Sequence, residues 1–191
     1  MKMLMAIFLT MFSAQLFAGN EQCSYSYDAA SSKVGFEAFK TYKKAGVKIG
    51  FDKVEITPST KETTVLGQVV GASFTIDTQT VNSANPVRDE KLKSMFFMNG
   101  KKALTIVGKV IDSKDDFVNV EFVIGGKKMV VPLKYTITDN KFEAKGTIDM
   151  LDFGLSSNLK KINKACLDLH EGKTWSDVNI FIESTFVKNC K

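Results

Sequence analysis

The feature that most constrains this chain is the alternation of apolar and polar side chains in segments separated by turn residues. In residues 118–124 every second side chain is large and apolar, Asn119 and Glu121 stand between them, and Gly125-Gly126 follows at once. Alternation with a period of two is typical of a strand that buries one face, and the glycine pair predicts a tight hairpin. The pattern predicts about eight antiparallel strands, drawn from residues 23–27, 34–38, 47–56, 65–76, 104–110, 118–124, 129–137, 142–150 and 177–187.

Such a chain can form a sandwich of two sheets or a closed barrel, and the alternation alone does not distinguish them. Glycines within the predicted strands favour the barrel, because they often mark bends or bulges where a sheet curves. They are Gly67, Gly71, Gly108 and Gly146. We therefore expect an all-β fold with a closed antiparallel barrel of about eight strands, whose interior holds side chains or one small ligand.

Two segments depart from the strand pattern. Pro86 suits the first turn of a helix over residues 87–95, where acidic residues come early and lysines late, as the helix dipole favours. Residues 156–173 carry apolar side chains near helical spacing. We expect a short helix near one mouth of the barrel and a helical loop before the last strand.

The first 18 residues have the pattern of a secretory signal peptide. Lys2 precedes an uncharged run over residues 3–12, and Ala18 offers a small residue at the cleavage edge. A membrane anchor is the alternative, but a spanning helix takes about 20 apolar residues and this run is shorter. We expect residues 1–18 to direct export and residues 19–191 to form one domain.

The composition excludes several classes of function. His170 is the only His, and the three Cys form no CxxC pair, so a His-rich metal site and a dithiol redox motif are excluded. Cys166 lies four residues before His170 and could pair with it as an activated nucleophile, but nothing in the sequence supplies the orienting third group. We expect no catalytic activity, no cofactor and no metal.

The positive charge is mild and spread along the chain. Lys and Arg number 26 against 21 Asp and Glu, a formal net charge of +5, and Arg88 is the only Arg. Nucleic-acid binders usually cluster their charge and read bases with Arg, so we expect no nucleic-acid partner. The lysines are compatible with a transient contact with a membrane surface.

Three stretches carry a family resemblance. Residues 75–97 comprise a strand, a turn, the helix start Arg88-Asp89-Glu90-Lys91-Leu92 and a Phe-Phe pair; residues 125–133 and Asp152-Phe153-Gly154 follow. This ordered set, over about residues 23–187, resembles the YceI-like domain family. Lys91 stands where the family often has His, and Met150 and Leu151 occupy the neighbourhood of a family Arg.

The resemblance implies a lipocalin-like barrel in an exported, periplasmic bacterial protein. Such a protein would enclose a polyisoprenoid or another long-chain amphiphilic lipid in its lumen for transport, storage or sequestration. The alternative is a solid-core periplasmic interaction or stress protein that acts through its surface. The residues expected to line the lumen are Phe36, Phe51, Phe74, Phe96, Phe97, Ile106, Val120, Phe122, Tyr135, Phe142 and Ile180.

Two cations near the predicted mouth are candidates to meet a lipid headgroup. They are Arg88 and Lys91. Arg88 could instead form a salt bridge with Asp89 or Asp152, and the short helix could simply cap the barrel. A homodimer is also compatible with the resemblance.

Export would place the cysteines in an oxidising compartment. In a closed barrel with an even number of strands, the first and last strands are antiparallel neighbours. Cys23 begins the first strand and Cys190 follows the last, so we expect these two to pair and Cys166 to stay free. A bridge between Cys166 and Cys190 is the alternative.

Overall fold

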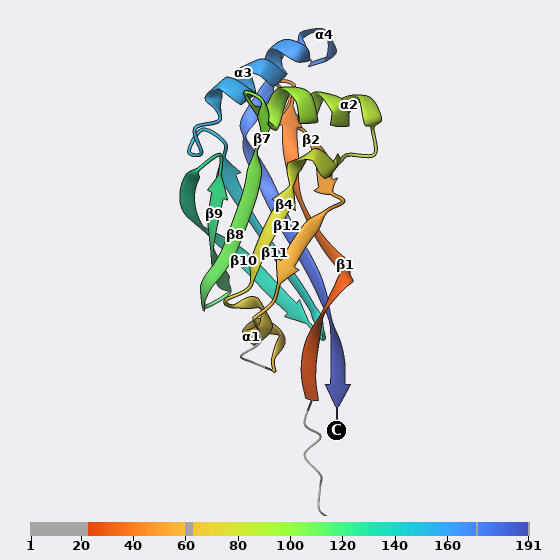
Figure 1. The fold of residues 1–191 in the computed structure, drawn as a ribbon, viewed down its shortest axis with the longest axis vertical. Coiled ribbons are helices and arrows are strands. Elements are labelled where there is room, and N and C mark those ends of the chain that lie inside the picture. The colour runs from red at the N-terminus through yellow and green to blue at the C-terminus, as the bar shows by residue number, and fades with distance from the viewer. Residues whose placement is uncertain (1–22, 60–62, 171, 191) are drawn as a thin grey trace, which may run out of the picture.

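The computed structural model describes residues 23–59, 63–170 and 172–190. The predicted signal peptide, residues 1–18, lies outside the described residues. One antiparallel sheet of ten strands dominates the fold and curls into a half-barrel (Figure 1). In order across the sheet, the strands are β3 (Val54–Thr57), β4 (Ser73–Asp77), β8 (Thr105–Lys114), β9 (Phe117–Ile124), β10 (Lys127–Thr138), β11 (Lys141–Asp149), β12 (Thr174–Cys190), β1 (Cys23–Lys40), β2 (Ala45–Phe51) and β5 (Val81–Asn82).

Most of the helices gather at one end of this sheet, the upper end in Figure 1. The remaining elements are α1 (Val65–Val69), the 3₁₀ turn η1 (Thr78–Thr80), α2 (Pro86–Lys91), the π-helical turn η2 (Leu92–Phe96), α3 (Ser156–Ala165), α4 (Leu167–His170), and a small pair of strands, β6 (Met98–Asn99) and β7 (Lys102–Ala103). The predicted helix over residues 87–95 is thus found as α2 and η2, and the predicted helical loop as α3 and α4.

The all-β class is confirmed, but the closed barrel of eight strands is not. The ladder of ten strands ends at β3 on one side and at β5 on the other. The sheet is therefore open between β3 and β5. In the link from β2 to β3, the Asp52 amide donates to the Thr80 carbonyl (3.0 Å) and the Lys53 carbonyl accepts from the Asp77 amide (3.2 Å). Because these residues bond to the η1 region, the chain bends there, and β2 stays paired with β1 while β3 pairs with β4.

The strand predicted over residues 65–76 is wrong in its first half. Residues 65–69 form α1, whose first turn is capped by the Thr64 hydroxyl, which accepts from the Gly67 amide at 3.1 Å. Val65 and Val69 lie four residues apart and are both buried on the side of the helix that meets the sheet. Gly67 therefore belongs to a helix, and only Ser73–Asp77 is a strand.

The predicted glycine hairpin is confirmed. Gly125 and Gly126 join β9 to β10 with φ of 58° and 83°, in the left-handed region that other residues avoid. The register that follows pairs Phe122 with Met129 and Val120 with Val131. The turn thereby sets which side chains of β9 face the interior.

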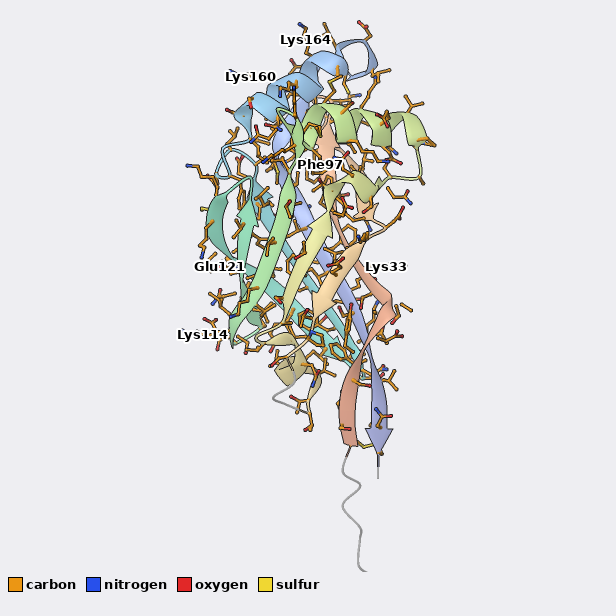
Figure 2. All side chains as sticks on the ribbon, viewed as in Figure 1. Lys33, Phe97, Lys114, Glu121, Lys160 and Lys164 are labelled. Carbon is orange, nitrogen blue, oxygen red and sulfur yellow. A yellow bond between two sulfur atoms is a disulfide. The ribbon has the colours of Figure 1, made fainter. Side chains whose placement is uncertain are left out.

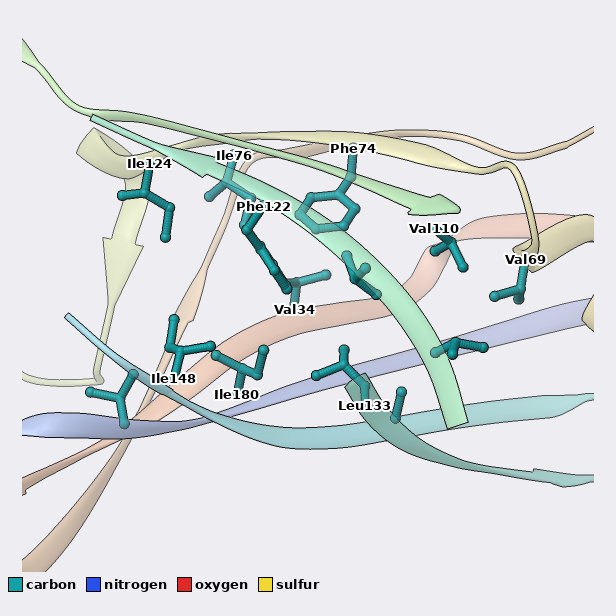
Figure 3. Packing of buried hydrophobic residues seen from close by; sticks show 14 of the residues in the cluster. Val34, Val69, Phe74, Ile76, Val110, Phe122, Ile124, Leu133, Ile148 and Ile180 are labelled. Atoms are coloured by element: carbon teal, nitrogen blue, oxygen red, sulfur yellow. The ribbon is translucent and has the colours of Figure 1, made fainter. Parts of the chain in front are cut away.

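The core lies on the concave side of the sheet (Figure 3). Phe74 and Phe122 cross it from β4 and β9 in an edge-to-face contact, with ring centroids 5.7 Å apart. The Phe74 ring lies against Gly108 of β8, where an added Cβ would stand only 2.0 Å from Phe74 Cζ. The Phe74 ring thus occupies the space that a side chain at position 108 would need.

We expect Gly108→Ala to lower the free energy of unfolding by about 1–3 kcal/mol, because the new methyl group displaces the buried Phe74 ring. Gly50→Ala is the matched control, since a Cβ on this β2 glycine meets its nearest atoms at 3.9 Å. Urea denaturation measures both variants. Equal midpoints for the two would contradict the close packing of Phe74 on Gly108.

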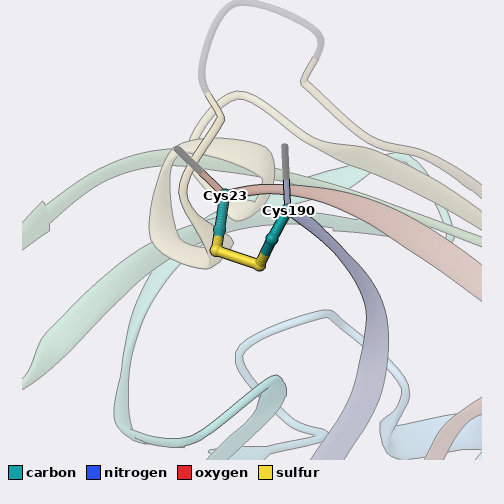
Figure 4. Close-up of a disulfide and its surroundings, with 2 residues drawn as sticks. All are labelled: Cys23 and Cys190. Atoms are coloured by element: carbon teal, nitrogen blue, oxygen red, sulfur yellow. A yellow bond between two sulfur atoms is a disulfide. The ribbon is translucent and has the colours of Figure 1, made fainter. Parts of the chain in front are cut away.

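The disulfide between Cys23 and Cys190 is confirmed (Figure 4). β1 and β12 pair from Cys23 opposite Cys190 to Lys40 opposite Thr174, and beyond the body of the sheet they continue together as a two-stranded arm (Figure 1). Cys166 is buried and free, so the alternative bridge through Cys166 is wrong.

Candidate binding cavity

An apolar cavity of about 90 Å³ lies between the sheet and the helical end. Strands β1, β2, β4, β8, β9, β11 and β12 contribute to its walls, and η2 and α3 contribute Leu92, Leu159 and Ile162 among others. Among the lining side chains only Thr174 and Trp175 carry a polar group. The Trp175 indole N–H donates to the Thr41 carbonyl at 2.8 Å. The cavity therefore offers an apolar ligand an almost wholly apolar surface.

Four phenyl rings occupy the side of this cavity nearest η2. Phe97 is central, with its ring centroid 5.1 Å from Phe96, 5.8 Å from Phe51 and 6.3 Å from Phe36. Buried Asn158 of α3 fixes the backbone there, because its Nδ2 donates to the carbonyls of Phe96 (2.6 Å) and Met98 (3.0 Å). One amide thus links α3 to the turn that carries the ring cluster.

A second apolar cavity of about 50 Å³ lies farther along the sheet, toward α1. Val34 and Ile182 line both cavities, whereas Phe122 lines the first and Phe74 the second. The edge-to-face pair of Phe74 and Phe122, with Val34 beside it, therefore forms a partition between the two spaces (Figure 3).

Tyr27 also lines the second cavity. Burial raises the pKa of the Tyr27 phenol above its ordinary value, and a side-chain hydrogen bond with Ser32 partly offsets this rise. The phenol therefore stays neutral at physiological pH, and the second cavity is uncharged on this side.

The predicted lumen residues divide between the two cavities. Seven line the first: Phe36, Phe51, Phe96, Phe97, Ile106, Phe122 and Ile180. Three line the second: Phe74, Val120 and Phe142. Tyr135 lines neither, because it stacks on Phe142 at 5.7 Å and directs its hydroxyl toward the Asp115 carbonyl (3.4 Å). A contact with ligand stays a prediction for all eleven.

An open groove of about 420 Å³ adjoins the first cavity on its helical side. Ala38, Leu92, Ile162 and Thr174 line both spaces, so the groove and the cavity share one wall. The cations along the groove are Lys40, Arg88 and Lys91, and none of its lining residues is acidic. The site thus joins an apolar interior to a positively charged entrance.

The two predicted headgroup residues both line this groove. Arg88 donates through Nε to the Ser83 hydroxyl (2.7 Å) and through a terminal nitrogen to the Ser83 carbonyl (3.0 Å). Ser83 in turn donates its amide (2.9 Å) and its hydroxyl to the buried Asp89 carboxylate. Among the described residues Arg88 forms no salt bridge, so the expected pairing with Asp89 or Asp152 is not found. Lys91 donates to the Ala165 carbonyl of α3 at 3.2 Å.

The residues considered for a metal site or an activated nucleophile can be placed in the described part of the chain. No three His, Cys, Asp or Glu residues there lie close enough to hold a metal ion. Cys166 is buried, and the side chain of His170 lies outside the described residues. None of the described helices is long and apolar enough to cross a membrane.

The family of this chain follows from a comparison with known domains. A family model described as the YceI-like domain matches residues 25–186, most of the chain. The chain belongs to the YceI-like domain family. A comparison with curated proteins finds no match.

Solved YceI-like and related structures share the fold. A polyisoprenoid binding domain from Saccharophagus degradans, implicated in plant cell wall breakdown, is similar with a TM-score of 0.63 and 16% identity, over 86% of this chain and 98% of that domain. BcnA from Burkholderia cenocepacia is similar with a TM-score of 0.55 and 15% identity, over 83% and 98% of the two chains. The Campylobacter jejuni YceI protein is similar with a TM-score of 0.51 and 16% identity, over 77% of this chain and 86% of that protein.

Several residues of this YceI-like site cannot be identified from the sequence alone. Asn158 reaches η2 from a distance of about 60 residues in the chain, as the hydrogen bonds to Phe96 and Met98 show. Lys40 belongs to the groove only because β1 passes beside α2. Trp175 had one available signal in the sequence, since it is the only Trp.

Proposed function

We propose that this YceI-like protein binds a long-chain apolar or amphiphilic ligand, such as a polyisoprenoid, and has no catalytic step. The observation that carries the proposal is the first cavity, lined by apolar side chains and joined along one wall to a cationic groove. The description of the Saccharophagus degradans domain as polyisoprenoid binding supports the same class of ligand.

The volume of the first cavity sets the free energy that a lipid tail gains on binding. With the side chains as they lie, about 90 Å³ holds roughly three methylenes, because a water-sized group takes about 30 Å³. Each buried methylene contributes about 0.8 kcal/mol, so the gross gain is roughly 2–3 kcal/mol before the loss of ligand motion is subtracted. A longer tail extends into the groove or displaces the half-buried rings of Phe36 and Phe96.

The groove suits a polar or anionic headgroup. Lys40, Arg88 and Lys91 bring three positive charges to it, with no acidic side chain among its lining residues. Arg88 and Lys91 are the headgroup-binding residues in this proposal. A headgroup held there leaves the tail pointing past Leu92 and Ile162 into the cavity.

Export to the periplasm belongs to the same proposal. The disulfide between Cys23 and Cys190 suits an oxidising compartment, and the N-terminal pattern is that of a signal peptide. The protein would then transport, store or sequester a lipid that is insoluble in water. The homodimer stays a prediction.

Filling the first cavity tests the proposal. We expect Ile106→Trp to weaken the binding of the fluorescent fatty acid cis-parinaric acid about tenfold or more, because the indole takes the space of several methylenes. Ile56→Trp is the matched control: Ile56 is also a half-buried strand residue but lines only the second cavity. Titration of the probe by its own fluorescence gives both affinities.

The outcomes separate the carrier from the solid-core alternative. Unchanged probe affinity in a folded Ile106→Trp variant would show that the first cavity is not the site. A wild-type protein that binds no probe would favour the protein that acts through its surface. A thermal melt of each variant confirms that it is folded.

A further inference from the structure

The positive charge of the chain is concentrated at the helical end. Residues 40–44, 86–95 and 156–173 together hold ten Lys and Arg against four Asp and Glu, an excess of six, whereas the whole chain carries +5. Hydrogen bonds join these three segments: the Thr41 amide donates to the Lys173 carbonyl (3.0 Å), and Lys91 Nζ donates to the Ala165 carbonyl (3.2 Å). We name these three segments the docking end.

Large apolar side chains protrude from the same segments. Tyr42 at the tip of the hairpin between β1 and β2 and Val87 in the first turn of α2 are each 70% exposed. Leu167 and Leu169 of α4 are 61% and 66% exposed. These are the four most exposed large hydrophobic side chains in the described part of the chain. Val87 and Leu169 both border the groove that leads to the cavity.

The arrangement fits a lipid surface better than a folded partner. The four exposed side chains stand on three separate elements, the hairpin between β1 and β2, α2 and α4, and only Val87 and Leu169 border the same groove. Figure 1 shows these three elements at one end of the sheet. A bilayer interface accepts such separate apolar points, while lysines around them meet anionic headgroups. Trp175, whose ring lies 4.3 Å from Lys173 Nζ and 5.1 Å from Lys44 Nζ, adds the aromatic residue typical of that interface.

We infer that the docking end binds the surface of an anionic membrane, with Leu167, Leu169, Val87 and Tyr42 in the headgroup layer and the lysines on anionic lipids. In this orientation the groove of Lys40, Arg88 and Lys91 faces the bilayer, and the arm closed by the disulfide points away from it. A lipid tail passes from the membrane to the cavity along the shared wall without crossing open water.

Flotation with vesicles tests the inference on the mature chain. The vesicles contain equal parts of phosphatidylglycerol and phosphatidylcholine, and pure phosphatidylcholine vesicles serve as the neutral comparison. We expect binding to the anionic vesicles only, and its loss at high salt, which screens exposed charges. No enrichment on anionic vesicles overturns the inference, whatever other partner the surface serves.

Two variants test the orientation. Removing three exposed lysines of α3 by Lys160→Gln, Lys161→Gln and Lys164→Gln weakens vesicle binding about tenfold or more. The double variant Leu167→Ser and Leu169→Ser does the same by removing the inserting side chains.

A matched control removes the same charge from the rest of the molecule, through Lys33→Gln, Lys114→Gln and Lys188→Gln. Figure 2 places Lys160 and Lys164 at the upper end and Lys33 and Lys114 well away from it. This control keeps wild-type vesicle binding. An equal loss in the control variant shows attraction by net charge alone and overturns the inference.

Binding of cis-parinaric acid separates this inference from the proposed function. The lysine variant keeps its affinity for the free probe, since none of its three substituted residues lines the groove or the cavity. A protein that binds vesicles through the docking end but never binds the probe would retain the docking site while the proposed function fails.

Discussion

Removal of the disulfide by the double variant Cys23→Ala and Cys190→Ala is expected to lower the free energy of unfolding by about 4–5 kcal/mol. The bridge closes a loop across a sequence separation of 167 residues, so in the chain-entropy account it removes much of the freedom of the unfolded chain. It also holds together the ends of β1 and β12, whose arm has few other elements beside it. Urea denaturation of the oxidised and variant proteins measures the difference.

Cys166→Ala is the control for this experiment. It removes the third cysteine, which is buried and unpaired, and leaves the bridge intact. We expect Cys166→Ala to lower the free energy of unfolding much less than the double variant does, because it truncates only a small side chain. If the double variant unfolded at the same urea concentration as the wild type, the arm would contribute nothing to global stability.

The cysteine pairing could be predicted because it depends only on which strands are neighbours. The first and last strands pair in the half-barrel as they would in a closed barrel, with Cys23 opposite Cys190. Whether the sheet closes into a barrel depends on the hydrogen bonds of Asp52 and Lys53 with the η1 region. The alternation of apolar and polar residues does not encode these contacts. A short apolar run such as residues 65–69 is equally compatible with a strand and with a helix, and here the Thr64 cap decides.

The candidate site was predicted in part for the same reason. Alternation assigns a face to each side chain, so most of the chosen phenyl rings do point to the concave side. Alternation carries no information on position along the strand, so Tyr135 packs against the core and still lies outside both cavities. The groove needs contacts between β1, α2 and α3, which only the folded chain brings together.

Phe122→Ala is expected to lower the free energy of unfolding by about 3–5 kcal/mol and to lengthen the tail that the protein accepts. Phe122 is 5% exposed, and its ring forms the partition with Phe74. Loss of the ring leaves a space that connects the first cavity to the second, because Val34 and Ile182 already line both. Phe122→Leu is a milder variant that keeps part of the partition and of the stability.

Phe142→Ala is the matched control, since Phe142 is 3% exposed and lines only the second cavity. Phe142→Ala removes the same number of atoms as Phe122→Ala and lowers the free energy of unfolding by a similar amount, but it leaves the partition in place. Displacement of cis-parinaric acid by saturated fatty acids of increasing length gives the longest tail that each protein binds. We expect the optimum to move to longer chains in Phe122→Ala, to move less in Phe122→Leu and to stay unchanged in Phe142→Ala. An unchanged optimum in both alanine variants would mean that the tail does not reach the partition, so that the ligand ends within the first cavity.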